Sequence, residues 1–339
     1  MAETVLEIEN LRTSFNIKGN YYAAVDGVSL TVHKNEVVAI VGESGCGKSA
    51  LALSIIGLHN AKTTKLEGQV NLKGQNLISL PVEKLNKIRG KDLGMIFQDP
   101  MTALNPLATI GRQIAEPMDY HMKLSSAAKK KRVLELLGQV GIKDANRIYK
   151  QYPHELSGGM RQRVVIAIAL ACNPVMLIAD EPTTALDVTI QAQIMDLMKE
   201  LQRITDSGII LITHDLGVVA EMANRVAVMY AGEFVEIADV NTLFSNPLHP
   251  YTRSLLSSIP SNMTDKEELH VIEGIVPSIQ KLDREGCRFA PRIPWISEDA
   301  HEDNPTLHEV EPGHFVRCTC YKKFHFPEER VEDENYVTT

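Results

Sequence analysis

The chain has 339 residues, 44% of them hydrophobic, and carries a formal net charge of −8 at pH 7. This length allows two or three structural units around a sizeable core, and the negative charge argues against nucleic acid as a partner, since nucleic-acid-binding domains are usually basic. No apolar stretch reaches the roughly 18 residues that a membrane-spanning helix needs, and the acidic N-terminus is unlike a signal peptide, so we expect a cytosolic protein.

The first element with recognisable chemistry is an apolar run, Val37–Val41, which predicts a buried strand. A G-x-x-x-x-G-K-S loop follows it, and residues 50–56 then predict a helix. Glycines let backbone N–H groups surround a phosphate, and the helix N-terminus adds partial positive charge. The alternative is an ordinary glycine-rich turn. The expected nucleotide-binding residues are Gly42, Glu43, Ser44, Gly45, Cys46, Gly47, Lys48, Ser49 and Ala50.

Two side chains of this loop have distinct expected roles. Lys48 is long enough to reach the β- and γ-phosphates of a nucleotide. The hydroxyl of Ser49 is expected to bind Mg²⁺.

Residues from about 101 to 158 are predicted to form a helical insert. Val133, Leu136, Leu137 and Val140 recur at the spacing of one helical face. The basic run 129–132 is expected on the solvated side of that helix, and contact with an acidic membrane surface is the alternative.

A second anion site is predicted where Ser157, Gly158 and Gly159 begin an apolar helical stretch. Serine is a good N-cap residue, and the two glycines expose backbone donors. The alternative is an ordinary helix start without a ligand.

Two further apolar runs, 175–179 and 209–212, each end in a polar group. Continuous apolar runs favour parallel strands buried on both faces, and ligands gather at the carboxyl ends of such strands. Asp180 is expected to hold Mg²⁺, and Glu181 to orient or deprotonate an attacking water. His214 is expected at the same edge. The alternatives are an acidic helix cap and a structural histidine.

Together these motifs resemble the ATP-binding cassette (ABC) family over most of residues 5–240. The stretch 156–160 is similar to the family's signature motif, with Met160 in place of glutamine, and 184–187 is similar to its D-loop. Gln98 matches the Q-loop glutamine, and His214 the switch histidine. The resemblance implies a head-to-tail dimer in which the signature of one subunit covers the ATP held by the other.

The same resemblance implies an α/β fold. It combines a phosphate-loop NTPase (RecA-like) core with an N-terminal antiparallel β portion, a helical insert and a small irregular C-terminal extension. It implies that Gln98 contributes to catalysis and to the Mg²⁺ site beside Glu181 and His214, and that Asp187 lies at the nucleotide. It also implies that an aromatic residue near the N-terminus, Tyr22 or Tyr21, stacks on adenine.

Downstream, residues 249–256 and 259–260 resemble the segment that ends the cassette in oligopeptide and dipeptide importers. Met160 is typical of the first of the two ATPases in those systems. Segments 274–278, 286–289 and 311–318 resemble the C-terminal extension of that family. The expected organisation is a nucleotide-binding domain over 1–240, an extension over 241–326 and a disordered tail over 327–339.

Relatives often carry four cysteines in the extension, and some hold an iron–sulfur cluster there. This chain has only Cys287, Cys318 and Cys320, and Ile293 stands where a relative has cysteine. A four-cysteine cluster site is therefore broken, and we expect the extension to fold without metal. The alternative is a zinc site of three cysteines and a nearby histidine, with His301, His308 and His314 as candidates.

The resemblance as a whole implies a peripheral ATPase subunit at the cytoplasmic face of the cell membrane, which uses ATP and Mg²⁺ to power peptide import. The implied partners are two transmembrane permease subunits, a second ATPase that is paralogous or identical, and indirectly an extracellular peptide-binding protein. The alternatives are an importer of nickel or another solute and a soluble ABC ATPase without a transport role.

Overall fold

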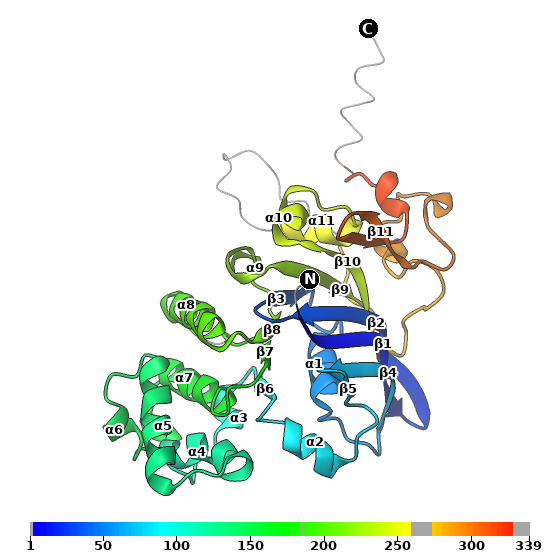
Figure 1. Ribbon diagram of the computed structural model, residues 1–339. Helices are drawn as coiled ribbons and strands as arrows, with labels where there is room; N and C mark the ends of the chain where they lie inside the picture. The colour runs from blue at the N-terminus through cyan, green and yellow to red at the C-terminus, as the bar shows by residue number, and fades with distance from the viewer. Residues whose placement is uncertain (1–2, 185, 259–272, 328–339) are drawn as a thin grey trace.

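The structure is a computed structural model that describes residues 3–184, 186–258 and 273–327. Two β-sheets lie side by side, a group of helices forms a separate lobe, and the C-terminal extension lies beside the far edge of the larger sheet (Figure 1). Three sequence-based expectations concern residues outside the described ranges: Ala185 of the D-loop, the 259–260 pair, and the predicted tail beyond residue 327.

The smaller sheet is antiparallel and has the strand order β2-β1-β4-β5. Its inward side chains, among them Leu6 and Ile8, share a core with Leu51 and Ile55 of helix α1. The expected N-terminal antiparallel portion is therefore present and covers the helix that follows the phosphate loop. The bounds are β1 Thr4–Ile17, β2 Asn20–His33, β4 Thr64–Leu72 and β5 Gln75–Asn76, with α2 Val82–Ile88 after them.

The larger sheet has the order β11-β12-β10-β9-β3-β8-β7-β6. Strands β9, β3, β8, β7 and β6 are parallel to one another, whereas β10 pairs antiparallel with β9. Every residue of β3, β7 and β8 is buried, as the continuous apolar runs predict. Their carboxyl ends therefore meet at one edge. The bounds are β3 Val37–Val41, β6 Leu93–Ile96, β7 Met176–Asp180, β8 Gly208–Ile212, β9 Arg225–Tyr230 and β10 Glu233–Asp239.

Helices pack on this sheet and connect its strands (Figure 1). Helix α1 starts immediately after the phosphate loop, and α8 and α9 follow β7 and β8. The bounds are α1 Lys48–Ile56, α8 Val188–Thr205, α9 Leu216–Met222, α10 Val240–Ser245 and α11 Pro250–Ser257. Among the described residues, no helix combines the length and hydrophobicity needed to cross a bilayer.

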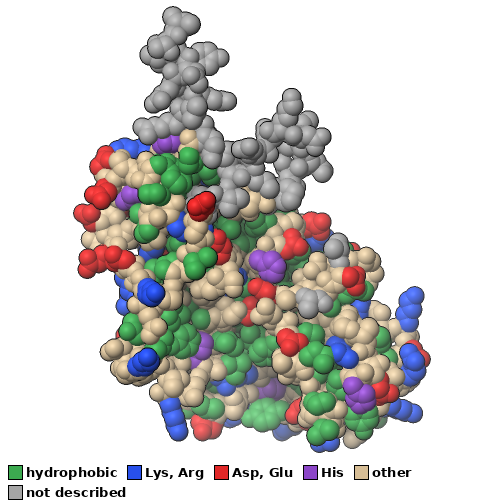
Figure 2. All heavy atoms as spheres, turned by 180° about the vertical axis from the view of Figure 1, so that it is seen from behind, with side chains coloured by type: hydrophobic (Ala, Val, Ile, Leu, Met, Phe, Trp, Pro, Cys, Tyr) green, Lys and Arg blue, Asp and Glu red, His purple; other side chains and the backbone are tan. Residues whose placement is uncertain are grey.

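The predicted helical insert forms the separate lobe of Figure 1. Val133, Leu136, Leu137 and Val140 are all buried, which confirms that they share one face. Figure 2 shows Lys and Arg side chains along the outer edge of this lobe, and Lys130 and Lys131 of α5 are exposed. The bounds are α3 Pro100–Ala103, α4 Ile110–His121, α5 Ser126–Gln139, α6 Ala145–Ile148, η1 Pro153–Glu155 and α7 Gly158–Ala169.

The C-terminal extension adds two strands to the larger sheet, because β12 pairs antiparallel with β10. The buried carboxylate of Glu236 on β10 lies 2.8 Å from His314 Nε2 on β12, which anchors this pairing. The sheet therefore continues across the domain boundary predicted at residue 240. The bounds are β11 Leu307–Glu311 and β12 His314–Arg317, with short 3₁₀ turns at η2 Ala290–Arg292, η3 Glu298–Ala300 and η4 Cys320–Lys322.

Candidate nucleotide-binding site

The phosphate loop joins β3 to α1, and its last glycine before the helix has backbone that a residue with a Cβ could not adopt without a clash. Gly47 has φ of 111°, and a Cβ there would lie 2.5 Å from the carbonyl oxygen of Ala24. The Lys48 ammonium donates hydrogen bonds to the carbonyls of Gly42, at 2.7 Å, and Glu43, at 3.0 Å. These bonds hold the cation within the loop, at the N-terminus of a helix that has no side-chain cap among the described residues.

The remaining loop residues divide by exposure. Ser44, Gly45 and Ser49 are exposed, whereas Cys46 is buried, and burial raises the pKa of its thiol. A protonated thiol adds no negative charge to the loop, so the loop keeps the positive character that an anion requires.

The predicted Mg²⁺ ligands Ser49 and Asp180 lie together. The hydroxyl of Ser49 donates to Asp180 Oδ1 at 3.3 Å, across the parallel strand ends. Asp180 is 5% exposed, and burial raises the pKa of its carboxyl. A serine hydroxyl and a carboxylate are oxygen ligands of the kind that Mg²⁺ prefers, so these two residues fit the ion.

Glu181 is the centre of a hydrogen-bonded group. Its Oε2 accepts from Gln98 Nε2 at 2.9 Å and from the hydroxyl of Thr184 at 2.8 Å. Its Oε1 lies 3.5 Å from His214 Nδ1. The structure thus brings together all three residues expected to act in catalysis. Thr184 also contacts Glu181. The sequence analysis assigned Thr184 only to the D-loop, although its position three residues after Glu181 could have indicated this contact.

The two side chains of this contact differ in exposure, since that of Glu181 is 17% exposed and that of His214 is 67% exposed. Glu181 also has a positive φ of 46°, which is uncommon for a residue with a Cβ. Its backbone N–H donates to the carbonyl of Ile212 at 2.8 Å, so the neighbouring strand β8 holds the turn in place. Strained backbone at such a position is a recurrent property of functional sites.

The second predicted anion site lies at the start of α7. The Ser157 hydroxyl caps this helix by accepting from Met160 N, and both Ser157 and Gly158 are exposed. Gly159 allows α7 to approach α8, because a Cβ there would lie 2.8 Å from Ile190 Cγ2. Asp187 caps α8 by accepting from Ile190 N. Among the hydrogen bonds of the described residues, none joins this helix start to the phosphate loop.

The expected adenine-stacking residue lies on β2. The backbone carbonyl of Ala24 on this strand lies against Gly47, and Tyr22 precedes Ala24 by two residues. Tyr22 is partly buried, whereas Tyr21 is exposed and lies on the opposite face. This placement favours Tyr22 over Tyr21 for contact with a nucleotide at the loop.

The C-terminal extension also reaches the phosphate loop, which sequence reasoning missed. The two terminal guanidinium nitrogens of Arg292 contact the Glu43 carboxylate, at 2.7 and 3.2 Å. The backbone N–H of Glu43 donates to the hydroxyl of Tyr251 at 2.7 Å. Tyr251 is buried against Phe289, with ring centroids 5.4 Å apart. The contacts join residues separated by about two thirds of the chain, and no local pattern could have indicated them.

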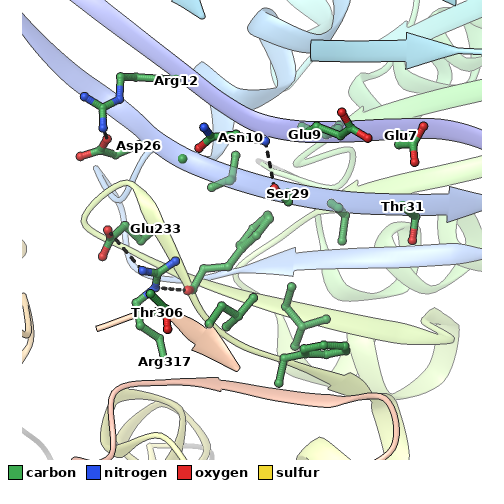
Figure 3. A pocket seen from close by; sticks show the side chains of 18 of the residues that line it. Glu7, Glu9, Asn10, Arg12, Asp26, Ser29, Thr31, Glu233, Thr306 and Arg317 are labelled. Carbon is green, nitrogen blue, oxygen red and sulfur yellow. Dashed lines mark hydrogen bonds and ion pairs between the residues drawn. The ribbon is translucent and has the colours of Figure 1, made fainter. Parts of the chain in front are cut away.

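A cavity of about 870 Å³ lies elsewhere, between the strands β1 and β2 and the hairpin β11–β12 (Figure 3). Its polar lining includes Arg12 with Asp26, 2.7 Å apart, and Arg317 with Glu233, 3.6 Å apart. None of the predicted nucleotide-binding residues lines it. The cavity is therefore not the candidate nucleotide site.

Comparison with known proteins places this geometry in a family. Residues 25–184 match the family model "ABC transporter", and residues 235–297 match "Oligopeptide/dipeptide transporter, C-terminal region". The chain is 49% identical to the oligopeptide transport ATP-binding protein OppD of Lactococcus lactis subsp. cremoris (strain SK11), with 98% of each protein covered. It is 53% identical to the dipeptide transport ATP-binding protein DppD of Bacillus subtilis (strain 168), covering 93% of this chain and 98% of that relative.

Among solved structures, the post-hydrolysis dimer of the ATP-binding cassette MJ0796 bound to ADP and phosphate is similar, with a TM-score of 0.63 and 31% identity. The match covers 69% of this chain and 98% of that one. Because the curated relatives match over nearly their full length, the chain belongs to the ABC transporter family, among the ATP-binding proteins of oligopeptide and dipeptide transport.

Proposed function

We propose that this chain is the ATP-hydrolysing subunit of a peptide importer, and that it binds ATP in the phosphate loop. The observation that carries the proposal is the group around Glu181. Gln98, Thr184 and His214 contact this carboxylate next to the Ser49–Asp180 pair, at the strand edge that bears the loop.

Nucleotide binding follows from the loop and the adjacent helix. Backbone N–H groups and the Lys48 ammonium provide positive charge for the β- and γ-phosphates. Ser49 and Asp180, with Gln98 close by, would hold Mg²⁺, which supplies charge neutralisation between the phosphates. Tyr22 is proposed to stack on the adenine ring.

For hydrolysis, Glu181 acts as the general base. Its carboxylate accepts the proton of the attacking water, and the hydrogen bonds from Gln98 and Thr184 fix its orientation. His214 lies 3.5 Å from the same carboxylate, and we propose that it contacts the γ-phosphate of bound ATP. Exposure of this histidine leaves it free to respond to the nucleotide.

The exposed start of α7, at Ser157 and Gly158, is suited to bind the phosphates of an ATP molecule held by a second ATPase subunit. In this arrangement Ser157, Gly158, Gly159 and Asp187 of one subunit complete the site of the other. ATP then favours the closed pair, and hydrolysis favours the open one. Movement at Gln98 and in the helical insert passes to two permease subunits at the cytoplasmic face of the membrane. An extracellular peptide-binding protein delivers the peptide.

The test is a comparison of Glu181→Gln with the wild-type chain. The variant should bind ATP with unchanged affinity, and its hydrolysis rate should fall by about 10²–10⁴-fold, the usual contribution of a general base. Glu200→Gln, at an exposed position of α8, is the matched control and should hydrolyse ATP normally. Near-normal hydrolysis by Glu181→Gln would overturn the base assignment.

The transport role requires a second measurement. The chain is co-expressed with its permeases and the second ATPase, and ATP-dependent uptake into membrane vesicles is measured with labelled peptides and with ⁶³Ni²⁺. Peptide uptake that is lost in Glu181→Gln supports the proposal. Uptake of nickel alone, or ATPase activity without any association with permeases, contradicts it.

A further inference from the structure

The C-terminal extension brings four metal-ligating side chains to one point, away from the nucleotide site. They are Cys287, His301, Cys318 and Cys320, and their ligand atoms all lie within 4.8 Å of one another. The four residues come from separate turns, because His301 follows η3, Cys318 follows β12, Cys320 begins η4 and Cys287 precedes η2. Folding of the extension therefore assembles this group.

Burial distinguishes the group from a chance surface cluster. Cys318 and Cys320 are fully buried, and Cys287 is 9% exposed. The ring nitrogen Nδ1 of His301 is buried and has no hydrogen-bond partner in the described chain. A buried polar atom without a partner destabilises the folded state, so a ligand for this ring would be favourable.

The other two histidines suggested by the sequence are already engaged elsewhere. His308 Nδ1 contacts the carbonyl of Thr306 at 3.1 Å. His314 Nε2 contacts Glu236, at 2.8 Å. Of the three, His301 is the histidine whose ligand atom lies within 4.8 Å of the cysteine sulfurs in the described chain.

The backbone around Cys318 favours thiolate ligation. Cys318 has φ of 67°, an uncommon conformation that turns the chain sharply and allows Cys318 and Cys320 to reach the same point. The backbone N–H of Glu302 donates to Cys318 Sγ at 3.5 Å. Such a bond stabilises a thiolate, which is the form that binds metals.

We propose that Cys287, His301, Cys318 and Cys320 bind one structural Zn²⁺ ion. Around zinc, with Zn–S near 2.3 Å and Zn–N near 2.0 Å, tetrahedral geometry sets ligand atoms about 3.5–3.8 Å apart. The observed group needs only a small inward movement to reach that spacing. In a four-iron cluster each ligand binds a different iron, so the ligand atoms stand farther apart, and the usual ligands are four cysteines.

The ion would stabilise a segment that has little regular structure. Within the described residues 273–327, the regular structure is one hairpin and short 3₁₀ turns, and small irregular units commonly depend on a metal or disulfides for stability. Arg292, which contacts Glu43, follows Cys287 by five residues. The proposal departs from the metal-free extension expected from the sequence, and it does not depend on the proposed transport function.

The test is metal analysis of the untagged full-length chain, purified without chelator or added metal. We expect zinc at close to one ion per chain and almost no iron by mass spectrometry. After chelation, Co²⁺ titration should give the intense absorption of tetrahedral thiolate-bound cobalt, saturating at one equivalent. Re-addition of Zn²⁺ should displace the cobalt and raise the thermal unfolding temperature.

Variants then identify the ligands. His301→Ala should lose most of the zinc, whereas His301→Cys, which supplies a fourth thiolate, should keep it. Cys172→Ser changes a free, half-buried thiol outside the group and should retain full zinc content.

Four results would each overturn the proposal: a wild-type chain that takes up neither Zn²⁺ nor Co²⁺, bound iron with acid-labile sulfide, a disulfide among these cysteines in the purified chain, or unchanged zinc in His301→Ala. If His301→Ala does not fold, the cobalt titration of the wild-type chain still shows whether the chain binds one metal ion through thiolates.

Discussion

Arg292 of the C-terminal extension forms a two-point ion pair with Glu43, the second residue of the phosphate loop. The Arg292 side chain is 9% exposed and that of Glu43 is 33% exposed, so the arginine side of the pair is shielded from solvent. Tyr251 accepts a hydrogen bond from the backbone of the same glutamate. The extension therefore restrains the conformation of the loop that is proposed to bind the phosphates.

Removing this restraint should weaken nucleotide binding. We expect Arg292→Gln to reduce ATP affinity several-fold in calorimetric titrations, because a less ordered loop loses more conformational entropy when ATP binds. In a double-mutant cycle with Glu43→Gln, the coupling free energy should be about 1 kcal/mol. Arg317→Gln is the control, because this arginine of the extension contacts the carbonyls of Phe234 and Pro305 instead. Equal ATP affinity in Arg292→Gln and wild type would contradict the prediction.

The proposed role of the α7 start can be separated from its capping role. In a Glu181→Gln background, Ser157→Glu should abolish ATP-dependent dimerisation measured by light scattering, because a negative charge is placed where a partner's phosphate is expected. Ser125→Glu is the matched control, since Ser125 caps α5 in the same way. A second ATPase subunit is included if the chain does not dimerise alone. Dimerisation that persists in Ser157→Glu argues against the sandwiched nucleotide.

The two N-terminal tyrosines should respond differently to truncation. Tyr22→Ala should weaken ATP binding by about tenfold, within the range measured for aromatic stacking on a base, and Tyr22→Phe should preserve it. Tyr21→Ala should have little effect, because this side chain lies on the other strand face. Fluorescent-nucleotide competition measures all three. The opposite ranking would assign the adenine contact to Tyr21.

His249 should make stability depend on pH. Burial lowers its pKa from 6.5 to about 4, and its Nδ1 accepts from Tyr251 N. The folded chain therefore holds a neutral ring, whereas the unfolded chain is protonated below pH 6.5. The contribution of this residue to the free energy of unfolding is complete above that pH. It falls by about 3 kcal/mol as the pH approaches 4.

The check is urea unfolding of wild type and His249→Asn at a pH of about 7.5 and about 5. Asparagine keeps an acceptor at the N-cap of α11 but does not titrate. The wild-type chain should lose more stability on acidification than the variant. Parallel losses in the two proteins would show that His249 is not the responsible group.

Much of the nucleotide site could be predicted from sequence because each part is encoded locally. The loop lies in consecutive residues between a strand and a helix, and β7 and β8 carry Asp180, Glu181 and His214 at their ends. Parallel strands then bring these ends together without further information. The roles of these residues remain predictions, while their proximity is observed.

The contacts of the extension could not be predicted, because they depend on tertiary packing. No residue near Glu43 in the sequence indicates that Arg292 or Tyr251 contacts it. None of the residues of β11 is fully buried, so its sequence does not show the alternation expected of a strand. The choice of His301 among three nearby histidines also required the fold, since only packing shows that His308 and His314 have other partners.

The pairing of β12 with β10 has a mechanical consequence. Backbone hydrogen bonds link the outermost hairpin to the strand that carries the phosphate loop, through two intervening strands. Because the sheet is continuous, any rotation of the phosphate loop's sheet would move the hairpin together with it. Deleting the hairpin would make β10 an edge strand. Its unpaired backbone N–H and C=O groups could then pair with other chains and promote aggregation.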